Sequence, residues 1–402
     1  MSQLPLDSSP FFELLNRQSP EERARLYTTE QFEETYIDWN GMLLPMHQGD
    51  AEAEYLAIRQ TCGAFDVSPL RQLRFIGPDA AALLDHTLTR PASSLAPGKG
   101  TYVVFCEADG TLRDDALLHR VADDEFLLMP SDMDHRPWFA DHQSVLGLED
   151  VRMQDESGER VGLALQGPRS AALLHGLGFT DIEALAPFAI RTFALPWGQV
   201  EVARMGFTGG LGYECWMTPE TGRAFAEALA PLHGDAQQGF LGYGLEALEA
   251  CRLECGHIVA GWDCSTAIDP QPGFERSPLE LGLDWLVKLD GPGFPGRDAL
   301  RAEKAEGPPT VLRSGVIHER VDLTDGLPLY ASGEPGAPRV GRLNNSAWSP
   351  GLDATIGNVS LEQKSADIEA AWLHHAGTVL AVSIRPTPLC RFDHLLTLPA
   401  PL

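Results

Sequence analysis

The sequence predicts an α+β protein built from two related halves and followed by a small β-barrel. Three observations support this prediction. Gly77-Pro78-Asp79 joins a strand-like run to a helical run, and Gly167-Pro168-Arg169 does the same further along the chain. After each joint come strand-like runs around a turn and then a helix, which indicates an internal repeat. Beyond residue 307, short strand-like runs alternate with turns, as is typical of an all-β barrel.

The two copies keep the same order of elements. The first reads FIGPDAAALL, TYVVFCE, TLRDDALLHRV and EFLLMP; the second reads LALQGPRSAALL, RTFALPW, QVEVARMGF and YECWMTP. Proline suits the first turn of a helix because its missing N–H has no partner there in any case. We therefore expect two small sheets, each backed by helices, with a ligand bound between the pseudo-symmetric halves.

These patterns divide the chain into three parts. They are a polar lead-in segment, residues 1–35; a region of two related halves with a further helix and loop, residues 36–306; and the barrel, residues 307–402. The halves span about 60–150 and 151–235. The boundary is placed at the Pro/Gly patch Gly307-Pro308-Pro309. The loop IVAGWDCSTAIDPQPGFERSP, which follows the helix ending near Gly256, is long enough to predict a functional loop or lid.

Composition excludes several classes of function. The formal net charge is −27, and so acidic a surface repels nucleic acid and anionic membranes. It also suggests adaptation to high salt, where like-charge repulsion is screened. The seven Cys form no CxxC pair and the 12 His show no metal-ligand spacing, so we expect no metal and a reducing, cytoplasmic location. The N-terminus does not read as a signal peptide, and no apolar run is long enough for a membrane span.

Two adjacent carboxylates, Asp114 and Asp115, lie in a predicted strand, where their side chains point to opposite faces. Asp114 shares its face with Leu112, Ala116 and Leu118, so alternation favours Asp114 as the buried one. A buried carboxylate is a candidate proton acceptor or a stabiliser of a cation. A pair of surface acids is the ordinary alternative on so acidic a protein.

Two further charged residues are candidates for binding. Glu214 follows the glycine-dense turn GFTGGLGYE, and its carboxylate suits the paired N–H donors of a pterin-like edge. Arg252 lies near the end of a helix and is a candidate for a substrate or cofactor carboxylate. The simpler alternatives are an edge-strand glutamate and an Arg252–Glu249 pair within the helix.

Seven blocks together resemble the aminomethyltransferase (glycine-cleavage T-protein) family. EYLAIRQTCGAFDVSPL with FIGPDAAALL resembles its first block, and DGTLRDDALL resembles its GG-x-x-DDL block. LALQGPRSAALL, GFTGGLGYE and RLECG resemble further family blocks, the last two being GYTGEDGFE and RLEAG there. SPLELGLDWLVKLDGPGFPGRDAL and NNSAWSPGL resemble the GL-x-W and SG-x-x-SP-x-L signatures. The match runs in order over roughly residues 40 to 360.

The resemblance implies a cloverleaf of duplicated folate-binding α+β halves with a C-terminal small β-barrel, and tetrahydrofolate as cofactor. By motif position, it selects Asp115 beside the reacting amine, with Asp114 as its neighbour, and Glu214 as the pterin-binding glutamate. It also implies cofactor contacts from six other residues: Arg252, Tyr102, Phe207, Leu70, Ser131 and Trp285.

Several positions depart from the family pattern. Phe207 replaces a tyrosine, Ala260 replaces a tyrosine, and Leu70 lies in FDVSPLR where the family has FDVSHMG. The lost hydroxyls predict a donor that is a small methylated amine or sulfonium compound, as in the demethylase members, with Trp262 and Phe274 as an aromatic wall. The alternatives are a true aminomethyltransferase acting on a lipoyl carrier protein, and a non-catalytic folate-binding protein.

Overall fold

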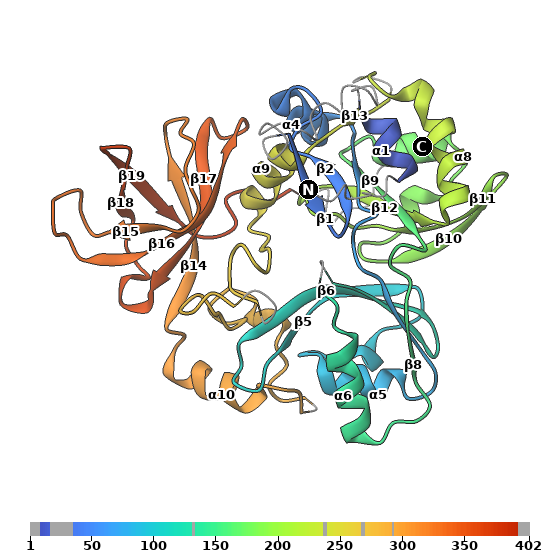
Figure 1. Cartoon of the computed structure of the whole chain (residues 1–402), viewed down its shortest axis with the longest axis horizontal. Helices are drawn as coiled ribbons and strands as arrows, with labels where there is room; N and C mark the ends of the chain where they lie inside the picture. The colour runs from blue at the N-terminus through green and yellow to red at the C-terminus, as the bar shows by residue number, and fades with distance from the viewer. Residues whose placement is uncertain are drawn as a thin grey trace, which may run out of the picture.

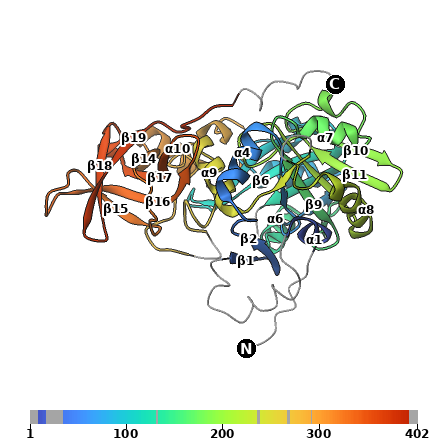
Figure 2. The ribbon, with the colours of Figure 1, turned by 90° about the horizontal axis from the view of Figure 1, so that it is seen from above.

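The structure is a computed structural model that describes residues 9–16, 35–130, 133–235, 239–266, 270–291 and 293–392. Three lobes are visible: two mixed α/β lobes and a barrel set apart from them (Figure 1). Seen from above, the barrel lies at one end of an elongated molecule (Figure 2). The predicted α+β class with a C-terminal barrel is confirmed.

The upper α/β lobe is built on a six-stranded sheet. Its order is β10 (Ile190–Leu195), β11 (Gly198–Ala203), β12 (Gly212–Met217), β9 (Val161–Gln166), β3 (Gly63–Asp66) and β13 (Leu241–Gly242). Helices α7 (Ser170–Gly176) and α8 (Pro219–Leu229) cover one face, joined by α1 (Pro10–Leu15). Phe11 of α1 is fully buried against Phe225 of α8, so this part of the expected lead-in segment contributes to the core.

The lower α/β lobe is built on a five-stranded sheet. Its order is β5 (Lys99–Cys106), β6 (Leu112–Ala122), β7 (Glu125–Pro130), β4 (Leu73–Ile76) and β8 (Arg152–Asp155). Helices α5 (Ala80–Thr87) and α6 (Arg136–Leu146) cover one face through a core that includes Leu84 and Phe139. The strand order β5-β6-β7-β4 repeats β10-β11-β12-β9, which confirms the predicted internal repeat.

Each joint between strand and helix depends on a glycine. Gly77 and Gly167 have φ of +131° and +130°, a conformation that L side chains rarely adopt. A Cβ at Gly77 would lie 2.1 Å from the Asp150 carbonyl oxygen, and one at Gly167 would lie 2.5 Å from that of Thr61. The two copies therefore need glycine for the same two reasons, backbone conformation and close backbone contact.

The two halves exchange one strand each. β3 immediately precedes the first copy yet pairs with β9 of the second, while β8 precedes the second copy and pairs with β4 of the first. The segments 67–72 and 156–160 consequently cross between the sheets. This exchange was not predicted, because hydrophobic alternation identifies a strand but not its partner.

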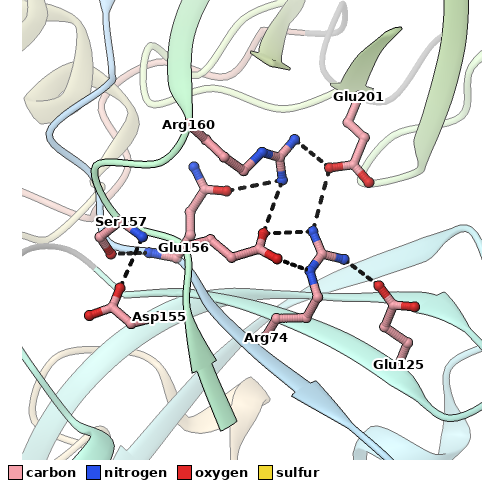
Figure 3. A network of polar contacts seen from close by, with 8 residues as sticks. Arg74, Glu125, Asp155, Glu156, Ser157, Arg160 and Glu201 are labelled. Atoms are coloured by element: carbon pink, nitrogen blue, oxygen red, sulfur yellow. Dashed lines mark hydrogen bonds and ion pairs between the residues drawn. The ribbon is translucent and has the colours of Figure 1, made fainter. Parts of the chain in front are cut away.

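An ion-pair network fastens the crossing segments (Figure 3). Arg74 of β4 donates to Glu156 at 2.6 and 2.9 Å and to Glu125 of β7 at 2.6 Å. Arg160, just before β9, lies 3.6 Å from Glu156 and pairs with Glu201 of β11 in the other sheet. The network therefore bridges the two sheets where their connections pass each other.

The remaining elements connect and close the fold. β1 (Tyr36–Trp39) and β2 (Met42–Pro45) form a hairpin, and α4 (Ala51–Gln60) packs on α9 (Leu245–Cys255). After α10 (Arg297–Glu306), the closed barrel comprises β14 (Thr310–Ile317), β17 (Ala354–Glu362), β16 (Arg339–Ser349), β15 (Leu327–Tyr330), β18 (Ala370–His375) and β19 (Thr378–Arg385). Short 3-10 turns are η1 (Ala92–Ser94), η2 (Ile182–Ala184), η3 (Ala230–Leu232), η4 (Asp284–Leu286) and η5 (Gln363–Ser365).

Candidate functional site

The uncovered faces of the two sheets pack onto one central hydrophobic cluster. Leu127 and Met129 of β7 and Trp216 of β12 belong to it, together with residues of α4 and α9. Leu117 of β6 packs against the same cluster. Side chains that share a face with Leu117 or Trp216 therefore face the centre of the molecule. Asp115 shares the face of Leu117, and Glu214 shares that of Trp216.

Alternation along β6 separates Asp114 from Asp115 as the sequence predicted. Asp114 is fully buried on the same face as Ala116 and Leu118, beneath α5 and α6. Asp115 is only partly exposed and lies on the opposite face. The more deeply buried carboxylate is therefore Asp114, as alternation predicted, and the one on the face toward the centre is Asp115.

Tyr102 and Asp115 form a hydrogen-bonded pair. Tyr102 Oη donates to Asp115 Oδ2 at 2.7 Å from the neighbouring strand β5. Burial, together with the nearby charges of Asp114 and Asp263, raises the pKa of Asp115 to about 8 despite the hydrogen bond from Tyr102. The pKa of Tyr102 is well above its usual value, chiefly through burial and then through Asp115. Asp115 is thus a carboxylate poised to hold or release a proton near neutrality.

Asp114 is held by His135, which the sequence did not mark as a candidate. His135 Nε2 lies 2.7 Å from Asp114 Oδ2, and both side chains are fully buried. Arg113 Nε donates to His135 Nδ1 at 3.3 Å, so the ring proton is on Nε2 and is donated to Asp114. The backbone N–H of Asp115 donates to Asp114 Oδ1 at 2.9 Å. Asp114 therefore fixes the backbone at Asp115 from beneath the sheet.

Glu214 is a buried carboxylate with a free oxygen. Its side chain is in β12, and Oε2 has no hydrogen-bond partner among the described residues. The nearby indole nitrogen of Trp216 is also buried and unpartnered within the described part of the chain. Burial raises the pKa of Glu214 to about 7. The indole N–H of Trp216 lies near enough to lower this pKa in part, although the two groups do not form a hydrogen bond of normal geometry. Buried polar atoms in native proteins are nearly always paired, so these two atoms are candidates for contact with a ligand or ordered water.

Arg252 has more partners than the sequence suggested. It is fully buried near the end of α9 and donates to Glu249 at 2.7 Å, to Asp263 at 2.9 Å and to the His257 carbonyl at 3.0 Å. The helical pair with Glu249 is therefore present. Its Nη2 has no partner among the residues described and remains an available donor.

The other expected contact residues are distributed around these groups. The Trp285 ring, 56% exposed, lies 6.3 Å from that of Tyr102, the residue that bonds to Asp115. Leu70 packs against the central cluster. Phe207 stacks on His257 with ring centroids 5.3 Å apart. Ser131 lies outside the described residues.

The two residues expected to form an aromatic wall differ in exposure. Trp262 is 42% exposed, and the Arg252 guanidinium carbon lies 5.6 Å from the centre of its ring. Phe274, in contrast, is buried, and the Arg342 guanidinium carbon lies 3.6 Å from its ring centroid. Phe274 is therefore covered by the barrel and presents no open ring to a donor.

Comparison with known proteins places this chain in a family. The protein-family model described as "GCVT N-terminal domain" matches residues 21–291 of the sequence. The chain is 30% identical over 362 residues to an aminomethyltransferase of Bacillus pumilus, covering 89% of this chain and 92% of that protein. It is also 30% identical to a probable aminomethyltransferase of Haloarcula marismortui, with 81% and 86% coverage.

A solved structure has the same fold. The glycine cleavage system aminomethyltransferase T from Bartonella henselae superposes with a TM-score of 0.78 at 23% identity, over 96% of this chain and 98% of that one. Among the described residues, no helix has the length and apolar character to cross a bilayer. The chain belongs to the GCVT family of aminomethyltransferases, a family of folate-dependent one-carbon transferases.

Proposed function

We propose that the protein transfers a one-carbon unit from a cationic amine or onium donor to tetrahydrofolate, with Asp115 beside the reacting centre. The observation that carries this proposal is that each sheet directs one carboxylate, Asp115 or Glu214, toward the central cluster. Asp115 is held by Tyr102 at 2.7 Å, while Glu214 has a buried oxygen without a partner among the described residues. The first suits a cation and the second suits an N–H donor edge.

The residues around Glu214 fit a pterin. A pterin edge presents adjacent N–H donors, which an ionised carboxylate accepts as a pair, and it also carries acceptors suited to the indole N–H of Trp216. Donors of this kind favour the charged carboxylate, so binding would lower the pKa of Glu214 from about 7. Leu70, Phe207, Tyr102 and Trp285 would supply apolar and aromatic surface, and Ser131 would add a hydroxyl.

Arg252 would act at the other end of the cofactor. Its Nη2 is the donor that Glu249 and Asp263 leave free, and a folate carboxylate is a matching acceptor. Bound tetrahydrofolate would supply the nitrogen nucleophile that accepts the carbon. The chain's own residues would orient the two reactants and hold the charge between them.

Asp115 would stabilise the donor electrostatically. Tyr102 occupies Oδ2, which leaves Oδ1 for the donor or its proton. A unit cation about 4 Å from the carboxylate gains about 4 kcal/mol at an effective dielectric constant of about 20. Such a cation favours the ionised form, so donor binding should release the proton that Asp115 holds below pH 8.

Two candidate donors remain for this reaction. A free methylated amine or sulfonium compound is supported by Phe207 and Ala260, which lack the hydroxyls of the family's tyrosines, and by the partly exposed ring of Trp262. An aminomethyl group on a lipoyl carrier protein is supported by the names of the relatives.

Product analysis tests both donors in one experiment. The purified protein is incubated with tetrahydrofolate and either a panel of methylated amines and sulfonium compounds or an aminomethylated lipoyl carrier protein. Methyl-folate from an onium compound would support the first candidate. Methylene-folate with ammonia from the carrier would establish the second instead, and no folate product from any donor would contradict the proposed function itself.

A further inference from the structure

Asp263 gathers three separate parts of the chain around one buried carboxylate. Its side chain is fully buried. Oδ2 accepts from Arg252 Nη1 and from the backbone N–H of Val259, both at 2.9 Å. Oδ1 accepts from Asn345 Nδ2 at 2.8 Å and from Asn358 Nδ2 at 2.9 Å. Four donors satisfy an ionised carboxylate, and two of them come from the barrel.

The barrel strands are shaped to reach this carboxylate. The register between β16 and β17 shifts between Leu343 and Asn345, so Asn344 is an extra, bulged residue. Asn344 Nδ2 then donates to the Asp263 carbonyl at 3.4 Å, alongside Asn345, which lies opposite Asn358. A strand without a bulge would point Asn344 and Asn345 to opposite faces.

The asparagine amides are oriented by Asp263 rather than by each other. An ionised carboxylate only accepts, so the Nδ2 groups of Asn345 and Asn358 must face it, while Nδ2 of Asn344 donates to the backbone carbonyl of Asp263. Their Oδ1 atoms are consequently buried without partners among the described residues, for Asn344, Asn345 and Asn358 alike. The three asparagines therefore direct their amide N–H groups at Asp263 and leave their own Oδ1 atoms without partners among the described residues. This orientation identifies Asp263 as the residue that the barrel holds.

The segment around Asp263 reaches the reacting carboxylate. Gly261 N donates to the Cys264 carbonyl at 2.8 Å, closing a tight turn that carries Cys264 inward. Cys264 is fully buried in the cluster that contains Val104, and Val104 lies opposite Asp115 in the sheet. Tyr102 packs against the same cluster. The position of this segment therefore determines what surrounds Asp115.

We infer that Asp263 is a positioning residue through which the C-terminal barrel holds the segment 257–266 against Asp115, so that the barrel completes the reacting site. Where it concerns turnover, the inference rests on the proposed function. Where it concerns the placement of the segment, it stands on the contacts alone. The barrel thus helps to arrange the residues around Asp115, although it lies outside the two α/β lobes.

The charged groups around Asp115 give this inference a pH signature. Tyr102 faces it from β5, and Asp263 and Cys264 lie near it in the segment, while the charge of Asp114 acts from the opposite face of its own strand. The charge of Asp263 contributes to the raised pKa of Asp115. Loosening the segment should move that charge away and lower the pKa, which shifts the corresponding limb of a rate profile toward acid.

Thiol labelling tests the placement without any assay of activity. In Asn358→Ala, loss of a hydrogen bond to a carboxylate should open the segment and raise the alkylation rate of Cys264 about tenfold or more. Cys255 and Cys390, which are partly exposed, serve as internal references by mass spectrometry. Ser314→Ala is the matched control, because Ser314 is buried beside Asn358 but bonds to Thr387 instead. Unchanged protection of Cys264 would overturn the inference.

Turnover tests the link to the reacting site. Asn358→Ala should lower kcat/KM about tenfold to a hundredfold and shift the pH limb toward acid, while the Ser314→Ala variant should keep the kcat/KM and pH profile of the unaltered protein. Faster alkylation of Cys264 without any change in kcat/KM or in the pH profile would show that Asp263 only stabilises the fold, and would refute its positioning role. Asn345→Ala, from the other strand, replaces Asn358→Ala if the latter does not fold. Absence of turnover in the unaltered protein would contradict the proposed function and leave the labelling result to decide the placement.

Discussion

Replacing Glu214 with glutamine should weaken folate binding and at the same time stabilise the ligand-free protein. The buried carboxylate has one oxygen without a partner among the described residues, and burial raises its pKa to about 7 from 4.5. In the unfolded chain the group loses its proton near pH 4.5, whereas the folded protein retains it until about pH 7. The free energy of unfolding therefore falls as pH rises through this window.

The size of the effect follows from the shift. A displacement from 4.5 to about 7 corresponds to about 3 kcal/mol once pH exceeds 7, at 1.36 kcal/mol per pKa unit. Glutamine keeps the shape and cannot ionise, so Glu214→Gln should be more stable than the unaltered protein at pH 8 by up to about 3 kcal/mol. At pH 4 the two should be nearly equal. The same change should reduce the affinity for reduced folate about tenfold to a hundredfold, because one charge-assisted pair of contacts is lost.

Urea denaturation at several pH values and calorimetric titration with tetrahydrofolate measure the two effects. Glu220→Gln, on the exposed surface of α8, makes the same change in charge and should alter neither quantity. If Glu214→Gln leaves both the pH dependence of unfolding and the folate affinity unchanged, then burial does not raise the pKa of Glu214 and the residue is not part of the cofactor site. A gain in stability without loss of affinity would place the folate elsewhere.

Three other outcomes are expected. Asp115→Asn should reduce turnover by about a thousandfold, because about 4 kcal/mol of charge stabilisation is lost, and should reduce folate affinity much less. Asp114→Asn should chiefly lower the free energy of unfolding, by about 1–3 kcal/mol, because Asp114 bonds to His135. A loss of turnover in Asp114→Asn alone would show that the two residues have the opposite roles. The rate profile of kcat/KM should rise with pH through about 8 as Asp115 ionises, and a profile flat between pH 6 and 9 would exclude it as the ionising group. With a net charge of −27, the melting temperature should rise between dilute buffer and molar sodium chloride, and a flat or falling value would count against salt adaptation.

Local chemistry is what the sequence predicts well here. The strand–turn–helix joints follow from Gly77 and Gly167, since each positive φ and close backbone contact is a property of one position. The end of α9 at Gly256, with φ of +70°, follows in the same way. The faces of Asp114 and Asp115 follow from alternation alone. Which of them faces the centre of the molecule does not, because that depends on what packs against each face.

Contacts between distant segments were not predictable from one sequence. His135 and Asp263 are single polar residues in loops, without a motif that marks them, and their importance appears only from burial and partners. Phe274 was misjudged for the same reason. A glycine- and proline-rich loop predicts an exposed aromatic ring, but Arg342 from the barrel covers it at 3.6 Å.

The strand exchange explains why both carboxylates of the site depend on the whole fold. Because β3 and β8 each complete the sheet of the other half, neither half can form its full sheet alone. Asp115 lies in one sheet and Glu214 in the other, so the distance between them is set by how the crossing segments are fastened. Arg74, Glu156 and Arg160 fasten them at one point, joining β4 and β7 to β11 (Figure 3). The side chains of these pairs are 10–30% exposed, so solvent screens each pair less than it would a pair on the open surface. The network therefore resists any motion that would slide one carboxylate past the other.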